Sequence, residues 1–225
     1  MLRKSFALKN ELERILSIQI IDALRVSINR KGEATLLVSG GSTPIGLFKE
    51  LSEFGFDWEK VTIGLVDERY VPTDNGDSNE KLIKTNLLIN KALSANFIGM
   101  IYDDSDYKIN LEIATKKNSV FNDGADVVVL GMGTDAHTAS LFPSDLNIKE
   151  HISSEKVLLN TTAPSFPEKR ITFTPHVLRK SRNLVLHITG EKKLELITSA
   201  ENEKNEIKHP IFSFINPKLT MYYTA

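Results

Sequence analysis

The stretch VVVLGMGTDAHTASLFP, residues 127–143, begins with four apolar residues and continues into a glycine-rich polar turn. An uninterrupted apolar run of this kind is typical of a strand buried on both faces of a parallel sheet. Gly131 and Gly133 indicate a tight turn, and Asp135 and His137 follow it two positions apart. An acid and an imidazole are therefore expected just beyond the end of a central strand.

The rest of the chain alternates apolar strands with helical patterns. Residues 8 to about 30 carry apolar positions at helical spacing, and we interpret the basic start MLRKSFALKNELERIL as part of that amphipathic helix and not as a signal peptide. This order predicts an α/β fold with a mostly parallel sheet and helices on both faces. Strands are expected at 34–39, 61–66, 125–133, 170–174, 183–190 and 218–224, and helices after residue 43 and at 80–93, 107–121 and 191–201.

Composition narrows the class of protein. The chain has 225 residues, 41% of them hydrophobic, and shows no repeat or linker, so we expect a single domain over residues 1–225. A net charge of −1 predicts no bulk attraction to nucleic acid. The absence of cysteine excludes disulfides and thiolate metal sites, and no apolar run is long enough to predict a membrane span. We therefore expect a cytoplasmic protein that is a monomer or a weak dimer.

Three predicted strand ends carry unusual side chains: Ser39–Thr43, Asp67–Arg69 and Gly131–His137. In open α/β sheets, ligands bind beyond the carboxyl ends of the strands. If these strands are parallel neighbours, the three loops open on the same edge of the sheet and form one site.

The first loop, with Gly40, Gly41, Ser42 and Thr43, leads directly into a predicted helix. Glycines let backbone N–H groups approach a ligand, and a helix start offers unpaired donors and a positive dipole end, so the loop is suited to a phosphate. It matches neither a Walker loop nor G-x-G-x-x-G. The alternative is an ordinary strand–turn–helix connection in which Ser42 or Thr43 caps the helix.

The second loop places Arg69 just past a strand end, and Arg170 enters a later strand. A guanidinium can bind two phosphate oxygens at once, so both are candidate anion ligands. The alternatives are a surface ion pair of Arg69 with Asp67 or Glu68 and a solvated strand end at Arg170.

The third loop carries His137, the candidate general base, because an imidazole can take up a proton near neutral pH. Asp135 or Asp67 could orient its ring. There is no G-x-S-x-G elbow for a serine nucleophile, and no set of residues spaced to bind a metal, so a directly activated water is the simpler mechanism. The alternative is a histidine that only stabilises the turn.

The remaining candidates are interpreted as structural. His187 lies within a predicted strand and is expected to be a buried histidine with its hydrogen bonds satisfied. Lys192 and Lys193, at a helix start, are expected in solvent. The other histidines are expected at the surface: His151, His176 and His209.

Taken together, these motifs resemble the 6-phosphogluconolactonase family. The matching pieces occur in the family's order and extend over residues 34 to 193, which makes the set specific although each piece is weak. They are VSGGSTP (38–44), DERYVP (67–72), SN (78–79), LGMGTDAHTASLFP (130–143), the segment 167–174 and TGEKK (189–193).

The resemblance implies a three-layer α/β/α sandwich with a Rossmann-like sheet. It implies hydrolysis of 6-phosphoglucono-1,5-lactone in the pentose phosphate pathway, without metal or cofactor. His137 matches the family's proposed general base, Arg69 its phosphate-binding arginine, and Arg170 the arginine of its R-[IV]-T motif.

Two positions depart from the family pattern. Ala136 replaces the usual glycine, which would cost about 1 kcal/mol or more if the position needs a positive φ. Ser165 stands where many members have a lysine, so the phosphate clamp is weaker or Lys169 substitutes. Two other functions remain open: an amino-sugar-phosphate deaminase or isomerase, which would need a working glutamate where Leu141-Phe142-Pro143 stands, and a non-catalytic sugar-phosphate sensor.

Overall fold

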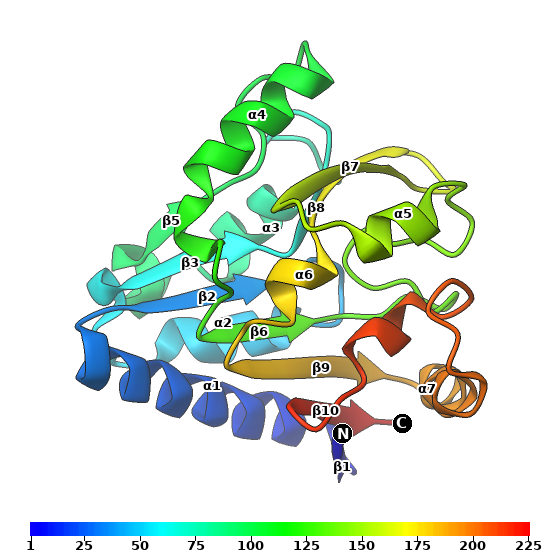
Figure 1. Ribbon diagram of the computed structural model, residues 1–225. Helices are drawn as coiled ribbons and strands as arrows, with labels where there is room; N and C mark the ends of the chain where they lie inside the picture. The colour runs from blue at the N-terminus through cyan, green and yellow to red at the C-terminus, as the bar shows by residue number, and fades with distance from the viewer.

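The computed structural model describes all residues, 1–225. A seven-stranded sheet of order β1-β10-β9-β6-β2-β3-β5 lies at its centre, and all neighbouring strands are parallel (Figure 1). The strands of this sheet are β1 (Leu2–Phe6), β2 (Ala34–Val38), β3 (Val61–Leu65), β5 (Asn96–Ile98), β6 (Val127–Leu130), β9 (Asn183–Thr189) and β10 (Leu219–Thr224).

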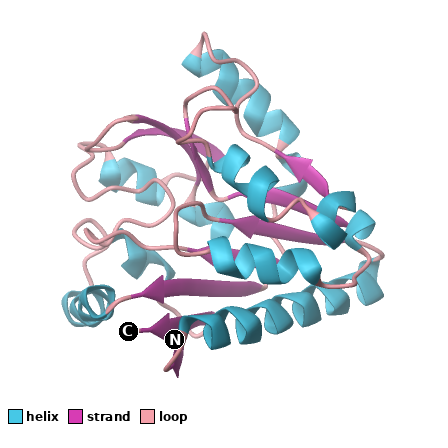
Figure 2. Ribbon diagram, turned by 180° about the vertical axis from the view of Figure 1, so that it is seen from behind, coloured by secondary structure: helices cyan, strands magenta, loops and turns pink.

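Helices cover both faces of this sheet. Helices α1 and α2 pack against each other on one face (Figure 2), and α4, α5 and α6 lie on the other side (Figure 1). The predicted three-layer α/β/α fold is thus confirmed. The α-helices are α1 (Lys9–Lys31), α2 (Ile45–Glu53), α3 (Asn79–Asn86), α4 (Tyr107–Lys117), α5 (Ile148–Ser153), α6 (Pro175–Leu178) and α7 (Glu191–Glu203), and the short 3-10 helices are η1 (Trp58–Lys60), η2 (Asn90–Ser94), η3 (Ser119–Phe121) and η4 (Pro210–Phe214).

A second, antiparallel sheet corrects the predicted placement of residues 170–174. That strand exists as β8 (Lys169–Phe173), but it pairs with β4 (Asp67–Arg69) and β7 (Leu158–Thr162) in the order β4-β8-β7. An apolar run shows that a strand is buried but not which sheet it joins, and so the alternation of the sequence did not separate the two sheets. The antiparallel register sets Arg69 opposite Arg170.

The N-terminus also differs from the prediction of a continuous helix. Residues Leu2–Phe6 form β1, a mostly exposed strand at the edge of the main sheet, and α1 begins only at Lys9. Phe6 stacks on Tyr222 of the neighbouring β10. A short edge strand with one polar face lacks the apolar run that marked the central strands. The helical spacing of the residues that follow therefore led to the prediction of one helix that includes the N-terminus.

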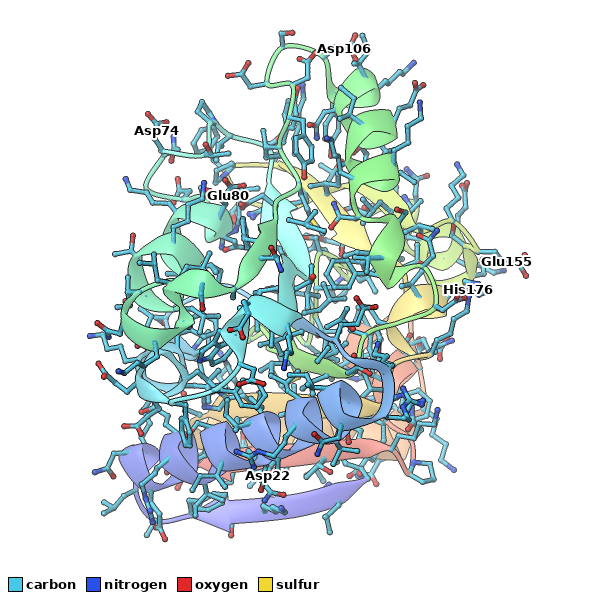
Figure 3. The ribbon with its side chains drawn as sticks, turned by 90° about the vertical axis from the view of Figure 1, so that its left-hand side faces the viewer. Asp22, Asp74, Glu80, Asp106, Glu155 and His176 are labelled. Atoms are coloured by element: carbon cyan, nitrogen blue, oxygen red, sulfur yellow. The ribbon has the colours of Figure 1, made fainter.

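The strand order fixes the place of the ligand site. From β2 the chain continues to β3 and β5 on one side, and from β6 to β9 and β10 on the other, so the order reverses between β2 and β6. A crevice at such a reversal, beyond the strands' carboxyl ends, is the usual ligand site of open α/β sheets. Figure 3 shows Asp22 on α1 and Asp106, the N-cap of α4, toward opposite ends of the molecule.

Candidate active site

Two adjoining cavities occupy the crevice beyond β2 and β6. The first, which we call the glycine-loop cavity, measures about 160 Å³ and is lined by Gly40, Gly41 and Thr43, among others. The second, the arginine cavity, measures about 390 Å³ and is lined by Arg170 and Ser165, among others. Four residues line both cavities, so the site is continuous: Asp67, Arg69, Gly133 and His137.

His137 stands at the junction of the two cavities and is bonded to Asp135. Its Nδ1 lies 2.5 Å from Asp135 Oδ1, and its backbone N–H donates to the same oxygen at 3.1 Å. Burial acts to raise the pKa of Asp135, but the hydrogen bond and charge of His137 outweigh it, and the pKa is lowered from its ordinary value. A carboxylate at Nδ1 favours the tautomer with the proton on that nitrogen, which leaves Nε2 as the basic atom.

The turn that carries this pair is tightly closed. The Gly133 N–H donates to the His137 carbonyl at 2.9 Å, and a Cβ at Gly133 would collide with the His137 ring. Ala136, fully buried between Asp135 and His137, has φ 67°. The position, where the family usually has glycine, therefore does need the left-handed conformation. The alanine therefore carries a backbone cost that a glycine would not.

Asp67, the other candidate orienter of His137, has different partners. Its Oδ2 accepts from Ser140 Oγ at 2.6 Å, and its backbone carbonyl accepts from Asn79 Nδ2 at 2.9 Å. It lines both cavities but makes no hydrogen bond to His137. The geometry therefore brings His137 together with Asp135 and leaves Asp67 as a separate buried acid at the floor of the crevice.

Glu68 is a site-forming residue that the sequence did not single out. Its carboxylate accepts from the backbone N–H groups of Arg69, Asn79 and Glu80, each at 2.7 Å, and from Ser78 Oγ at 3.1 Å. Burial raises its pKa to about 7 in spite of these donors. By holding the start of α3 against β4, Glu68 positions Asn79, which lines the glycine-loop cavity. The motifs DER (67–69) and SN (78–79) were the sequence signal that could have indicated this contact.

The two predicted arginines face each other across the register of β4 and β8. Arg69 Nη1 donates to the Asp77 carbonyl at 2.6 Å, while the buried Arg170 Nε has no partner in the protein. Burial, and then the charge of Arg69, lower the pKa of the Arg170 guanidinium. Two adjacent guanidinium groups repel each other, so the arrangement favours an anion between or beside them.

Lys169 does not take the place of the lysine that many family members carry. Its ammonium lies over the rings of Tyr70 and Tyr107, at 5.8 and 5.4 Å from their centroids. It lines neither cavity, whereas Ser165 lines the arginine cavity. The cationic side chains lining this part of the site are Arg69 and Arg170.

The glycine loop lies against α3 at one side of the glycine-loop cavity. A Cβ at Gly40 would collide with the side-chain oxygen of Asn79, so the close approach of these two segments requires glycine there. Neither Ser42 nor Thr43 caps the next helix, because Pro44 holds the N-cap position and makes no side-chain hydrogen bond. Ser42 is exposed and does not line the cavity, unlike Gly40, Gly41 and Thr43. The N–H groups at the start of α2 thus lack a capping side chain.

Several residues expected to be structural lie differently. His187 is buried as predicted, but neither ring nitrogen has a hydrogen-bond partner, and the residue lines the glycine-loop cavity. His209 is buried and not at the surface, and His151 is half-buried beside Asp145. Lys193 is half-buried, and this burial lowers its pKa, whereas Lys192 is exposed as predicted.

Two further observations bear on the chemistry. No cluster of three or more His, Cys, Asp or Glu side chains is arranged to hold a metal ion. None of the helices combines the length and the apolar character needed to cross a membrane.

Comparison with known proteins identifies the family. Residues 8–221 match the family model described as glucosamine-6-phosphate isomerases/6-phosphogluconolactonase. The chain is 40% identical over 190 residues to a 6-phosphogluconolactonase of Rhizobium meliloti, covering 84% of this chain and 82% of that one. It is 34% identical over 215 residues to a 6-phosphogluconolactonase of Pseudomonas aeruginosa, covering 95% and 90% of the two chains.

Solved structures agree with this result. The crystal structure of a 6-phosphogluconolactonase from Shewanella baltica superposes with a TM-score of 0.96 at 34% identity, covering 100% of this chain and 98% of that one. A monomeric glucosamine-6-phosphate deaminase shares the fold, with a TM-score of 0.81 over 100% and 97% of the two chains, but only 15% of the sequence. From the match over most of its length, the chain belongs to the family of glucosamine-6-phosphate isomerases and 6-phosphogluconolactonases.

Proposed function

We propose that this protein is a 6-phosphogluconolactonase, which hydrolyses 6-phospho-D-glucono-1,5-lactone to 6-phospho-D-gluconate in the pentose phosphate pathway. The observation that carries the proposal is the His137–Asp135 pair at the junction of two cavities that both present groups for anions. The names of the relatives and of the Shewanella baltica structure support the same activity.

The glycine loop and the arginines divide the binding of the substrate between them. Backbone N–H groups of Gly40, Gly41 and Thr43, which line the glycine-loop cavity just before α2, are assigned to the phosphate. Arg69 lines both cavities and can reach the phosphate from the junction, and Arg170 is a second cationic clamp on the far side of His137. Losing either guanidinium should weaken binding more than it changes the chemical step.

The chemical step needs one base and one water. Nε2 of neutral His137 takes a proton from a water as the water oxygen bonds to C1 of the lactone. The Asp135 carboxylate stabilises the imidazolium that forms, through the bond to Nδ1. As the tetrahedral intermediate collapses, the bond from C1 to the ring oxygen breaks and His137 returns the proton to that oxygen. The product acid then loses its own proton to solvent.

The deaminase alternative requires a carboxylate that this site lacks. The place of the working glutamate of those enzymes is occupied by Leu141 and Phe142, which are both buried and apolar, followed by Pro143. A sensor would need no base, and the His137–Asp135 pair would then have no purpose. Lactone hydrolysis is the function that uses all the groups gathered at the crevice.

The test is a proton-release assay on freshly prepared 6-phosphogluconolactone, with the spontaneous hydrolysis subtracted. We expect enzyme-dependent acid release from the lactone and no ammonia release from glucosamine 6-phosphate. Ammonia release without lactone hydrolysis would favour the deaminase, and neither activity would favour the sensor.

We also propose that residues 1–225 act as one domain, because 51 buried residues form one continuous hydrophobic cluster. No cofactor or metal is required by the proposed mechanism, and a small sugar-phosphate lactone is the expected partner, without nucleic acid or membrane. A cytoplasmic monomer or weak dimer remains our expectation.

A further inference from the structure

His187 is a buried polar residue without a partner in the protein. Its side chain lies on β9, opposite Tyr222 in the parallel register with β10, and only 2% of the residue is exposed. Neither Nδ1 nor Nε2 has a hydrogen-bond partner. A buried donor or acceptor that is left unpaired lowers the stability of the fold, so we expect this ring to take a partner from outside the chain.

The position of His187 in the sheet identifies the part of the site that it faces. Leu186 pairs with Leu130, so His187 lies one step further, at the level where β6 ends and the site begins. The charge of Lys9, the first residue of α1, acts on the His187 ring, so the ring lies on the α1 side of the sheet. This is the face where α1 and α2 lie, and α2 follows the glycine loop. His187 is therefore beneath the glycine loop and lines its cavity.

The charges around His187 favour an anion. Burial, and then the positive charges of Lys9 and Lys193, lower its pKa to about 4, so the ring is neutral at physiological pH. Lys9 is paired with Glu13 at 3.4 Å, but Lys193, although half-buried, has no carboxylate within ion-pair distance. The neutral ring of His187 and the backbone of Gly40, Gly41 and Thr43, just before α2, line the same cavity, whereas Lys193 acts on the ring through its charge and does not line that cavity.

We propose that His187 is a substrate-binding residue that donates a ring N–H to the phosphate group held at the glycine loop, and that it helps the enzyme select phosphorylated lactones. This rests on the proposed function for the identity of the substrate. A donor beneath the phosphate would complement the N–H groups of the loop above it. The contact is made in the ground state and in the transition state alike, so it should act on KM more than on kcat.

The alternative is that His187 only fills space in the core. Two variants distinguish this hypothesis from phosphate binding. His187→Leu removes the donor but keeps an apolar side chain of similar size, which should leave the melting temperature unchanged or raise it, since an unpaired polar group is removed. His187→Gln keeps an amide donor and should recover part of the lost affinity. A control is His209→Leu, since His209 is also a buried histidine but lines neither cavity; its Nε2 lies 3.4 Å from Glu203 Oε2, so only its effect on KM and Kd, and not on the melting temperature, is compared with that of His187→Leu.

The experiment measures KM and kcat on 6-phosphogluconolactone, and calorimetric Kd values for 6-phosphogluconate and inorganic phosphate. For His187→Leu we expect KM and both Kd values to rise about 10- to 100-fold, as for the loss of one hydrogen bond to a charged group, with kcat changed by less than about 3-fold. The ratio of kcat/KM for the phosphorylated lactone to that for glucono-1,5-lactone should fall by a similar factor.

Unchanged KM and Kd values in a folded His187→Leu protein would overturn the proposal. So would an equal loss on both lactones, because the contact would then be to the sugar and not to the phosphate. A wild-type protein without lactonase activity would instead refute the proposed function, and the phosphate affinities of the variants would still decide whether His187 binds the anion.

Discussion

Replacing Asp135 by asparagine tests how His137 is oriented. The Asp135 Oδ1 atom accepts from both the ring Nδ1 and the backbone N–H of His137. An asparagine oxygen can accept both bonds, so the turn should keep its conformation. The variant removes only the negative charge that faces the imidazole, and any loss of rate reports on that charge.

The size of the effect follows from the type of hydrogen bond. A bond to a charged group contributes about 1.5–3 kcal/mol and a neutral bond about 0.5–1.5 kcal/mol, which leaves a difference of about 1–1.5 kcal/mol. That difference lowers kcat about 5- to 13-fold. The Asp135 side chain is 43% exposed, so solvent screens the charge and the lower end is expected. KM should change little.

The assay is proton release at saturating lactone, with the melting temperature as a check on folding. The matched control is Asp67→Asn, since Asp67 is bonded to Ser140 and not to His137. If Asp135→Asn retains the wild-type kcat while Asp67→Asn loses it, the orientation of His137 has been assigned to the wrong acid.

Substitutions at four other positions probe the site and the fold. His137→Asn should lower kcat about 10²- to 10⁴-fold while the melting temperature and the affinity for 6-phosphogluconate stay near wild type; a folded variant with near-normal turnover would exclude a base role. Arg69→Ala should raise KM about 10- to 150-fold, for the loss of about 1.5–3 kcal/mol, and an unchanged KM would show that Arg69 does not hold the phosphate. Ala136→Val should lower the free energy of unfolding by more than about 2 kcal/mol, because a β-branched residue is strongly disfavoured at φ 67°. Ala136→Gly should stay within about 1 kcal/mol of wild type, because relief of backbone strain offsets the lost burial of the methyl group. Equal stability of the two variants in denaturant melts would contradict the strain argument. Asp126→Asn should cost about 1–3 kcal/mol at neutral pH, because the buried carboxylate accepts from Ser27 and Thr35 and pairs with Lys31. Burial acts to raise the pKa of Asp126, but the hydrogen bonds of Lys31, Ser27 and Thr35 lower it overall from 3.8. This contribution to stability is therefore present above pH 3.8 and is lost as the pH falls through the lower pKa of the folded state. A difference in stability between wild type and variant that persisted at the lowest pH would refute the assignment.

The fold could be predicted where local pattern and tertiary environment agree. The apolar runs of β2, β3, β6 and β9 mark buried parallel strands because both faces of such strands are covered. The same reasoning failed for β1, which is an edge strand, and it could not assign β8 to its own sheet. Pairing partners of a strand depend on contacts distant in sequence, which periodicity does not encode.

The site could be predicted in outline for a related reason. Parallel strands bring their carboxyl ends to one edge, so loops with glycine, arginine and histidine at strand ends were expected to meet, and the glycine loop, Arg69 and His137 do line one cavity. The roles of Glu68 and Asn79 were not predicted. A carboxylate that holds a helix start against a strand has the same sequence appearance as a solvated acid.

His187 shows most clearly what the sequence cannot supply. From the sequence alone, a histidine within an apolar strand is expected to be buried with its hydrogen bonds satisfied, because most buried polar groups are. Whether a given ring finds a partner depends on all the chain segments that pack around it, and here none provides one. Arg170 Nε is in the same condition on the other side of His137. Each unpaired group lowers the stability of the free protein and can be satisfied by an anionic ligand. We therefore predict that phosphate-containing ligands raise the melting temperature of the wild type, in which both groups can bind the anion, more than that of His187→Leu, in which only Arg170 remains.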